Sequence, residues 1–240
     1  MGIWSCGGPA SQSLLKGADF YYQEGMRDLE KRRYLKAQEK LQRVVSNFPG
    51  SPLIADAQFH LGEAYFGLKE YVSAVFEFQR VIDAYGHSRW VARAQFKIGE
   101  SYYRQMRRAE LDQTETYQAL AHFRSFIEDN PDSPLVEDAA QRIVECRSRL
   151  AKKSYLSARL YHRQGYLEPA RLSYEEVVRS FPDTPWYFVA MVELGDIARR
   201  QGDIDQARYY WEEVIDQTED EKLKHRALKL LSGLGTPEGE

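Results

Sequence analysis

Residues 62–78, GEAYFGLKEYVSAVFEF, contain the pattern that decides the fold. A small residue, Gly62, is followed 12 positions later by Ala74, and the large apolar residue Phe78 comes 4 positions after that alanine. Small residues at such spacing allow two paired helices to approach closely, and an aromatic side chain can fill the space beside them. The stretch therefore predicts a helical hairpin, with the aromatic residue filling the wedge between one hairpin and the next.

The same pattern recurs along the chain at intervals of 37 residues, which indicates an array of similar units. The small residue of each unit stands at positions 25, 62 and 99, and again at 158 and 195. In the third unit the alanine comes 20 rather than 12 positions after the glycine, so eight residues, about 106–113, are inserted between its helices. The small–x₁₁–Ala–x₃–large pattern resembles the tetratricopeptide repeat (TPR), which implies an all-α solenoid of five helical hairpins.

A single long helix is expected between the third and fourth units. Ser133-Pro134 is a helix-start signal, and neither glycine nor proline stands between Leu135 and Gln164, so we expect a helix over about 134–164. The expected organisation is a disordered tether (1–12), an N-terminal TPR group of repeats 1–3 (13–132), the long helix with repeats 4–5 and a capping helix (133–232), and a disordered tail (233–240).

Composition and motifs argue against several classes of protein. A net charge of −3 gives no electrostatic footprint for nucleic acid, and no apolar stretch is long enough to span a bilayer. The two cysteines, Cys6 and Cys146, cannot form a disulfide framework or a zinc site, and the five histidines match no metal-ligand motif. We therefore expect no cofactor, no metal and no enzymatic activity, and a monomer that acts by binding other proteins.

The first helices of the N-terminal repeats carry an aromatic column with carboxylates beside it. By resemblance to TPR proteins, these helices line a concave groove, and aromatic rings there can bind a peptide with an aromatic anchor. The alternative is that the rings only fill space between neighbouring helices. The residues of the expected peptide groove are Tyr22, Phe59, Glu63, Phe66, Phe96, Glu100 and Tyr103.

A more specific resemblance lies in the C-terminal half. Arg149-Leu150-Ala151 and the later run Phe181-Pro182-Asp183-Thr184-Pro185 resemble the hallmark of the BamD family, lipoproteins of the outer-membrane β-barrel assembly (BAM) complex. The resemblance implies that the C-terminal repeats dock the POTRA domain of BamA, although Leu172-Ser173 replaces the Asn-Arg common in the family. The residues expected to dock BamA are Arg159, Tyr161, His162, Arg163, Arg171 and Ser173.

The resemblance also implies further partners and a location. Unfolded β-barrel proteins would bind in the N-terminal groove, and other BAM lipoproteins would be neighbours. Ile3-Trp4-Ser5-Cys6 resembles the end of a lipobox, with Cys6 as the lipidated residue, although no signal-peptide segments precede it in this sequence. We expect a lipid-anchored protein on the periplasmic side of the cell outer membrane, whose only contact with the membrane is its lipid.

Two other functions fit the same repeats. One is a periplasmic TPR coordinator of envelope growth or cell division that has no barrel substrate. The other is a TPR interaction domain of a different assembly, whose catalyst lies elsewhere.

Overall fold

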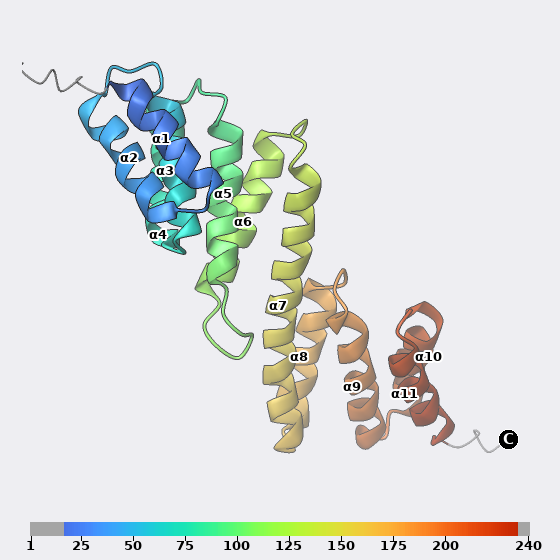
Figure 1. The fold of residues 1–240 in the computed structure, drawn as a ribbon. Coiled ribbons are helices and arrows are strands. Elements are labelled where there is room, and N and C mark those ends of the chain that lie inside the picture. The colour runs from blue at the N-terminus through green and yellow to red at the C-terminus, as the bar shows by residue number, and fades with distance from the viewer. Residues whose placement is uncertain (1–16, 235–240) are drawn as a thin grey trace, which may run out of the picture. The chain divides into compact units, whose positions relative to one another are not determined.

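The computed structural model describes residues 17–234, and within this range the chain is entirely helical apart from its turns and loops. The all-α repeat fold predicted from the sequence is confirmed. The described range contains eleven helices that follow one another along the chain, and within the two compact units α1 pairs with α2, α3 with α4, α7 with α8, and α9 with α10 (Figure 1). The helices are α1 (Ala18–Glu30), α2 (Tyr34–Asn47), α3 (Ile54–Gly67), α4 (Tyr71–Ala84), α5 (Val91–Gln105), α6 (Thr114–Asp129), α7 (Val136–Arg163), α8 (Leu167–Ser180), α9 (Trp186–Gln201), α10 (Ile204–Gln217) and α11 (Glu221–Ser232).

The chain divides into two compact units, residues 1–104 and residues 105–240. The division falls at the C-terminal end of α5. The boundary at 132/133 expected from the sequence is a division by repeats, and it stays a prediction.

In the first unit, α1 packs on α2, α2 on α3, and α3 on α4. The residues that drive this packing recur every three or four positions, which places them on one face of each helix. Leu41, Val44 and Phe78 are among the fully buried side chains of this core.

In the second unit, α7 packs between α6 and α8, and α9 packs against α8 and α10. The long helix expected over about 134–164 is observed as α7, residues 136–163. The last helix, α11, lies against α10 and α9 and covers the side chains of Trp211 and Val214, as expected of a capping helix. Asp220 caps α11 by accepting hydrogen bonds from the backbone N–H groups of Lys222 and Leu223.

The small and large residues of the repeat pattern contact each other directly. A Cβ atom added to Gly62 would lie 2.6 Å from Cε1 of Phe78, and one added to Gly25 would lie 2.8 Å from Cγ of Leu41. The same clash would occur between a side chain at Gly195 and Trp211. The large residue therefore packs against the small residue of its own hairpin, which refines the prediction that it fills the wedge between hairpins.

The turns inside the hairpins differ between the two units. In the first unit, Arg32 (φ 53°) and Lys69 (φ 64°) occupy left-handed backbone conformations, which are unfavourable for residues that carry a Cβ atom. In the second unit, the corresponding turns have Gly165 (φ 84°) and Gly202 (φ 86°), which adopt this conformation without steric cost.

The segment before α6, residues 106–113, is held against α7 by bonds to its main chain. Nη1 of Arg149 donates to the carbonyl oxygen of Arg107 at 2.5 Å, and Nζ of Lys153 donates to that of Leu111 at 2.8 Å. Gln113, itself buried, donates to the carbonyl oxygen of Arg108. This is the range in which the sequence places the insertion of the third repeat, and the insertion is an ordered loop on the long helix.

Candidate protein-interaction sites

The first unit contains a pocket of about 230 Å³ formed by side chains of α1, α2, α3 and α5. Its walls are aromatic and aliphatic side chains, and one carboxylate and one ammonium group also line it. The residues that line it are Leu29, Tyr34, Glu63, Phe66, Gly67 and Lys97. We call it the N-terminal pocket.

The charged groups of the N-terminal pocket are fixed by their neighbours. Nδ1 of His60 lies 2.7 Å from Oε2 of Glu63. Burial by itself would raise the pKa of Glu63, but the hydrogen bond and charge of His60, together with Lys97 and Arg93, outweigh it and hold this pKa below its ordinary value. Glu63 is therefore ionised at neutral pH, so the pocket contains a fixed negative charge.

Lys97 supplies the opposite charge and contacts an aromatic ring. Its Nζ atom lies 4.5 Å from the ring centroid of Phe66 and donates to Oε2 of Glu100 at 2.7 Å. An ammonium group over a ring face is a cation–π contact, which orients both side chains. Lys97 was not among the residues predicted from the sequence, because a single lysine between core positions gives no signal of its own.

Two of the predicted groove residues belong to the core instead. Phe59 is 0% exposed, and its ring stacks on that of Trp90 with centroids 4.3 Å apart. Phe96 is only 8% exposed. We therefore correct the assignment of Phe59 and Phe96 to a peptide-contacting surface: their rings fill space between helices, the alternative considered from the sequence.

The remaining predicted groove residues are at least partly accessible. Glu63 and Phe66 line the N-terminal pocket, whereas Glu100 is paired with Lys97 beside it. Tyr22 and Tyr103 are half-buried and do not line the pocket. Of the residues predicted to form the peptide groove, the N-terminal pocket therefore contains only the carboxylate of Glu63 and the ring of Phe66.

The second unit contains a larger cleft, about 450 Å³, between α7, α9 and α11. Four arginines and one leucine surround a floor of two carboxylates and a histidine. The residues that line it are Arg159, His162, Arg163, Glu193, Asp196, Arg200, Arg226 and Leu230. We call it the arginine cleft.

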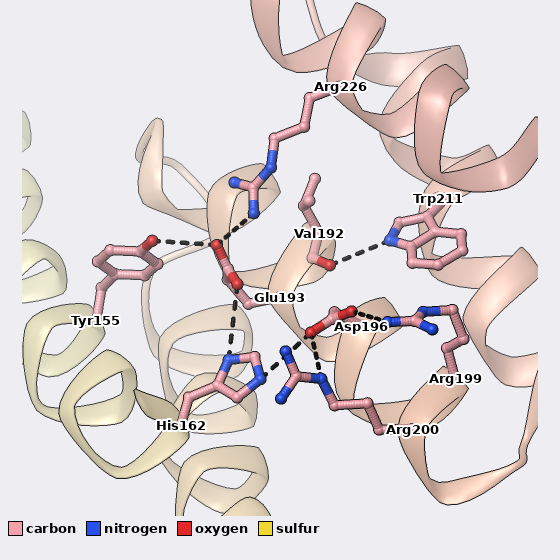
Figure 2. A network of polar contacts seen from close by, with 9 residues as sticks. All are labelled: Tyr155, His162, Val192, Glu193, Asp196, Arg199, Arg200, Trp211 and Arg226. Atoms are coloured by element: carbon pink, nitrogen blue, oxygen red, sulfur yellow. Dashed lines mark hydrogen bonds and ion pairs between the residues drawn. The ribbon is translucent and has the colours of Figure 1, made fainter. Parts of the chain in front are cut away.

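Glu193 is the first of the two carboxylates on the floor, and each of its oxygens has a partner (Figure 2). Its Oε1 atom accepts from Nη2 of Arg226 at 2.8 Å and from the hydroxyl of Tyr155 at 3.3 Å. Its Oε2 atom lies 3.7 Å from Nδ1 of His162.

Asp196, one turn further along α9, is held in the same way. Its Oδ1 atom accepts from Nη2 of Arg199, its Oδ2 atom lies 2.8 Å from Nε of Arg200, and Nε2 of His162 is 3.4 Å from that second oxygen. Burial alone would raise the pKa of Asp196, but the hydrogen bond from Arg199 and the nearby guanidinium charges lower it below its ordinary value. Both floor carboxylates are thus already compensated by protein groups.

Arg159 and Arg163 differ from the other arginines of the cleft. Both are exposed, and within residues 17–234 neither forms an ion pair or a hydrogen bond. They stand four positions apart on α7, so their side chains lie on the same helical face. Their guanidinium groups are available for a partner.

The residues predicted to dock BamA do not form one surface. Arg159, His162 and Arg163 line the arginine cleft, whereas Arg171 is paired with Glu168 and Glu175. Tyr161 is exposed but lines none of the pockets described for this unit.

Ser173 lies in a separate groove of about 380 Å³ formed by α6, α7 and α8. Its neighbours there include the exposed side chains of Tyr117 and Leu172. We call this the Ser173 groove. Because Arg171 and Ser173 are two positions apart on α8, they point in different directions from the helix.

The described residues offer little for catalysis. Burial raises the pKa of the Cys146 thiol to about 12, so this thiol is not a nucleophile at neutral pH. No cluster of three or more His, Cys, Asp or Glu side chains suited to a metal ion occurs within residues 17–234. Over the same range, no helix combines the length and the apolar character needed to cross a membrane. Cys6, the predicted lipidation site, lies outside the described residues.

Comparison with known proteins gives one family and several solved structures. The model of a family described as YfiO, outer membrane lipoprotein, matches residues 16–212. No curated protein matches the chain. The structure titled TPR2AB-domain:pHSP90-complex of yeast Sti1 is 12% identical, with a TM-score of 0.48, and the match covers 90% of this chain and 82% of that one. The TPR protein TTC0263 of Thermus thermophilus is 17% identical, with a TM-score of 0.40, and the match covers 90% of this chain and 100% of that one.

Proposed function

The chain belongs to the YfiO family of outer membrane lipoproteins, and on that premise we propose that it is a non-catalytic scaffold of the β-barrel assembly complex. The BamD-family resemblance found in the sequence is confirmed by this membership. In our proposal, the C-terminal repeats dock the POTRA domain of BamA, and the N-terminal repeats bind unfolded outer-membrane proteins. Other lipoproteins of the complex would be further partners.

The N-terminal pocket carries the proposal for substrate binding. In our proposal, the bound segment is the C-terminus of an unfolded barrel protein, an aromatic residue that carries the terminal carboxylate. The side chains of Leu29 and Phe66 offer an apolar surface for the ring, and the ammonium group of Lys97 lies 4.5 Å from the Phe66 ring centroid, where it can meet the carboxylate. The fixed charge of Glu63 would repel a carboxylate placed in the opposite orientation, which favours one direction of binding.

The Ser173 groove supports docking by the C-terminal repeats. Leu172 is 58% exposed at its edge, and Tyr117 stands exposed in the same groove. Exposed apolar side chains around a concave groove are typical of protein-binding surfaces. Ser154 and Ser157 of α7 line the same groove.

The proposed location follows from the family. An outer membrane lipoprotein is held by acyl chains, which contribute about 0.8 kcal/mol per buried CH₂ group. We propose Cys6 as the lipidated residue and the periplasmic side of the outer membrane as the place where the repeats work.

Two variants examined in two binding assays test the proposal. Phe66→Ala should weaken binding of a peptide with the C-terminal sequence of a barrel protein several-fold, because it removes the ring from the N-terminal pocket, while capture of BamA stays unchanged. Leu172→Glu should weaken BamA capture and leave peptide binding unchanged, because it places a charge in an apolar contact. Each variant serves as the control for the other, and circular dichroism checks that both remain helical.

Equal losses in both assays, or no loss in either, would contradict this division of labour. Recovery of peptidoglycan enzymes from envelope extract in place of BamA would favour the coordinator of envelope growth.

A further inference from the structure

The arginine cleft has more positive than negative groups. Arg159, Arg163, Arg199, Arg200 and Arg226 surround it or pair with its floor, against the two carboxylates of Glu193 and Asp196. We propose that this cleft binds the carboxylate side chains of an acidic, partly apolar segment of a partner protein. The inference rests on the proposed docking role of the C-terminal repeats and adds a second site, with its own chemistry, to the Ser173 groove.

The floor of the cleft explains why two arginines stay available. Arg226 satisfies Glu193, whereas Arg199 and Arg200 satisfy Asp196, so neither carboxylate competes for the side chains of α7 (Figure 2). A guanidinium group presents a planar fork of N–H donors that matches both oxygens of a carboxylate. Two such forks four positions apart on one helix can each hold one acidic side chain of an extended or helical segment.

A buried histidine offers another polar group at the base of the cleft. His162 lines the cleft and is 8% exposed, and its Nε2 atom has no hydrogen-bond partner although Asp196 is 3.4 Å away. Buried polar atoms without a partner are uncommon in folded proteins, and a ligand group is one way to satisfy them. The contact of Nε2 with Asp196 is an ion-pair distance without hydrogen-bond geometry, so this nitrogen keeps its capacity for a hydrogen bond.

The surroundings favour a carboxylate over a phosphate group. A phosphate monoester carries nearly two negative charges at neutral pH, and the floor already holds two carboxylates. In addition, α7 ends at Arg163 and α9 ends at Gln201, so the negative ends of two helix dipoles lie near the cleft. Leu230 provides an apolar wall for an uncharged neighbour of the acidic residue. The negative groups disfavour a doubly charged phosphate more than a singly charged carboxylate, and the apolar wall suits a segment in which acidic and apolar residues alternate.

The test uses the full chain and a pair of synthetic peptides. One peptide alternates Glu and Leu and has both ends blocked, and its partner has Gln in place of every Glu. Isothermal titration should show binding of the Glu peptide alone, and this binding should weaken as salt is added. Arg159→Gln combined with Arg163→Gln should weaken it about tenfold or more, because the variant removes both guanidinium groups that can hold a carboxylate with two N–H donors.

A matched control removes two charges elsewhere. Arg43 and Arg80 are exposed arginines of the first unit, on α2 and α4, so Arg43→Gln with Arg80→Gln changes the net charge equally. This control should bind the Glu peptide as the unaltered chain does. Equal weakening in both double variants, or equal binding of the Glu and Gln peptides, would overturn the inference.

Two further titrations separate the possible sources of anion binding. Inorganic phosphate and vesicles of anionic phospholipid should not compete with the Glu peptide at matched charge concentration. If either displaces the peptide through Arg159 and Arg163, the site is a phosphate site and the inference is wrong. BamA capture by the unaltered chain is measured in parallel. If this chain captures BamA but does not bind the Glu peptide, only this inference is rejected. If it binds the Glu peptide but does not capture BamA, only the docking proposal is rejected.

Discussion

Glu63 in the first unit and Arg159 in the second occupy the same place in the repeat, one position after the small residue of a first helix. Glu63 is partly buried and bonded to His60 of its own helix, whereas Arg159 is exposed and unpaired within the described residues. Three positions further along the same helix, one residue before its last residue, stands Phe66 in one unit and His162 in the other. The repeat therefore sets the backbone and the core, whereas the side chains next to the small residue set what each unit can bind.

The core of the first unit is the first part of this comparison to test. Phe59→Ala should destabilise the first unit by about 3–5 kcal/mol, because it removes a fully buried ring that contacts Trp90 and Phe78. Phe76→Ala, on the same unit but 60% exposed, should change the free energy of unfolding by less than about 0.5 kcal/mol. Urea denaturation followed by circular dichroism measures both. Similar losses of unfolding free energy for the two variants would contradict the assignment of Phe59 to the core.

The turns within the hairpins give the next largest effect. Gly202→Ala should destabilise the second unit by about 1–2 kcal/mol, because a Cβ atom is unfavourable at φ 86°. Lys69→Gly should stabilise the first unit by up to about 1 kcal/mol, because Lys69 already pays this cost at φ 64°. Thermal and urea unfolding of both variants check the signs. If both variants change the free energy of unfolding in the same direction, the proposed energetic difference between the turns of the two units is wrong.

Ion pairs with acidic residues should give the smallest effect, and it should depend on pH. Hydrogen bonding to Lys40 lowers the pKa of Asp28, and hydrogen bonding to Arg147 lowers that of Asp183. A lowered folded-state pKa stabilises the protein above the ordinary Asp pKa of about 3.9, and this stabilisation is lost as the pH falls through the lowered value. Asp183→Asn should therefore cost about 0.2–1 kcal/mol at neutral pH and progressively less in acid.

Asp28→Asn should show the same pH dependence with a larger loss, because the Asp28 side chain is 7% exposed and that of Asp183 is 40% exposed. Unfolding free energies measured across the acid range compare the two variants. A loss that persists unchanged below the pH at which both carboxyl groups are protonated would assign the effect to packing and not to charge.

Much of the fold could be predicted because it depends on spacing. The small residue, the alanine and the large residue recur at fixed intervals, and Ser133-Pro134 and Gly165 mark the two ends of the long helix. These are local signals, and local signals are the ones that a single sequence contains.

The site could be predicted only in part because contact with distant residues decides which side of a helix is covered. Phe59 and Phe66 are both rings on α3, yet Trp90 covers only the first by stacking on it, and nothing in the spacing places Trp90 there. In the same way, Glu193 of α9 pairs with Arg226 of α11, whereas Arg159 of α7 is unpaired within the described residues, and nothing in the spacing distinguishes the two arginines. A single sequence gives no distance between such residues.

The loop before α6 has one consequence for how the chain can change. Arg149, Lys153 and Gln113 hold it through the carbonyl oxygens of Arg107, Leu111 and Arg108. Every amino acid carries such an oxygen, so the fastening does not depend on which side chains the loop displays to solvent. Mutations can therefore change the exposed side chains of this loop while its backbone keeps the same path along the long helix. Related proteins could in this way bind different partners through the same loop.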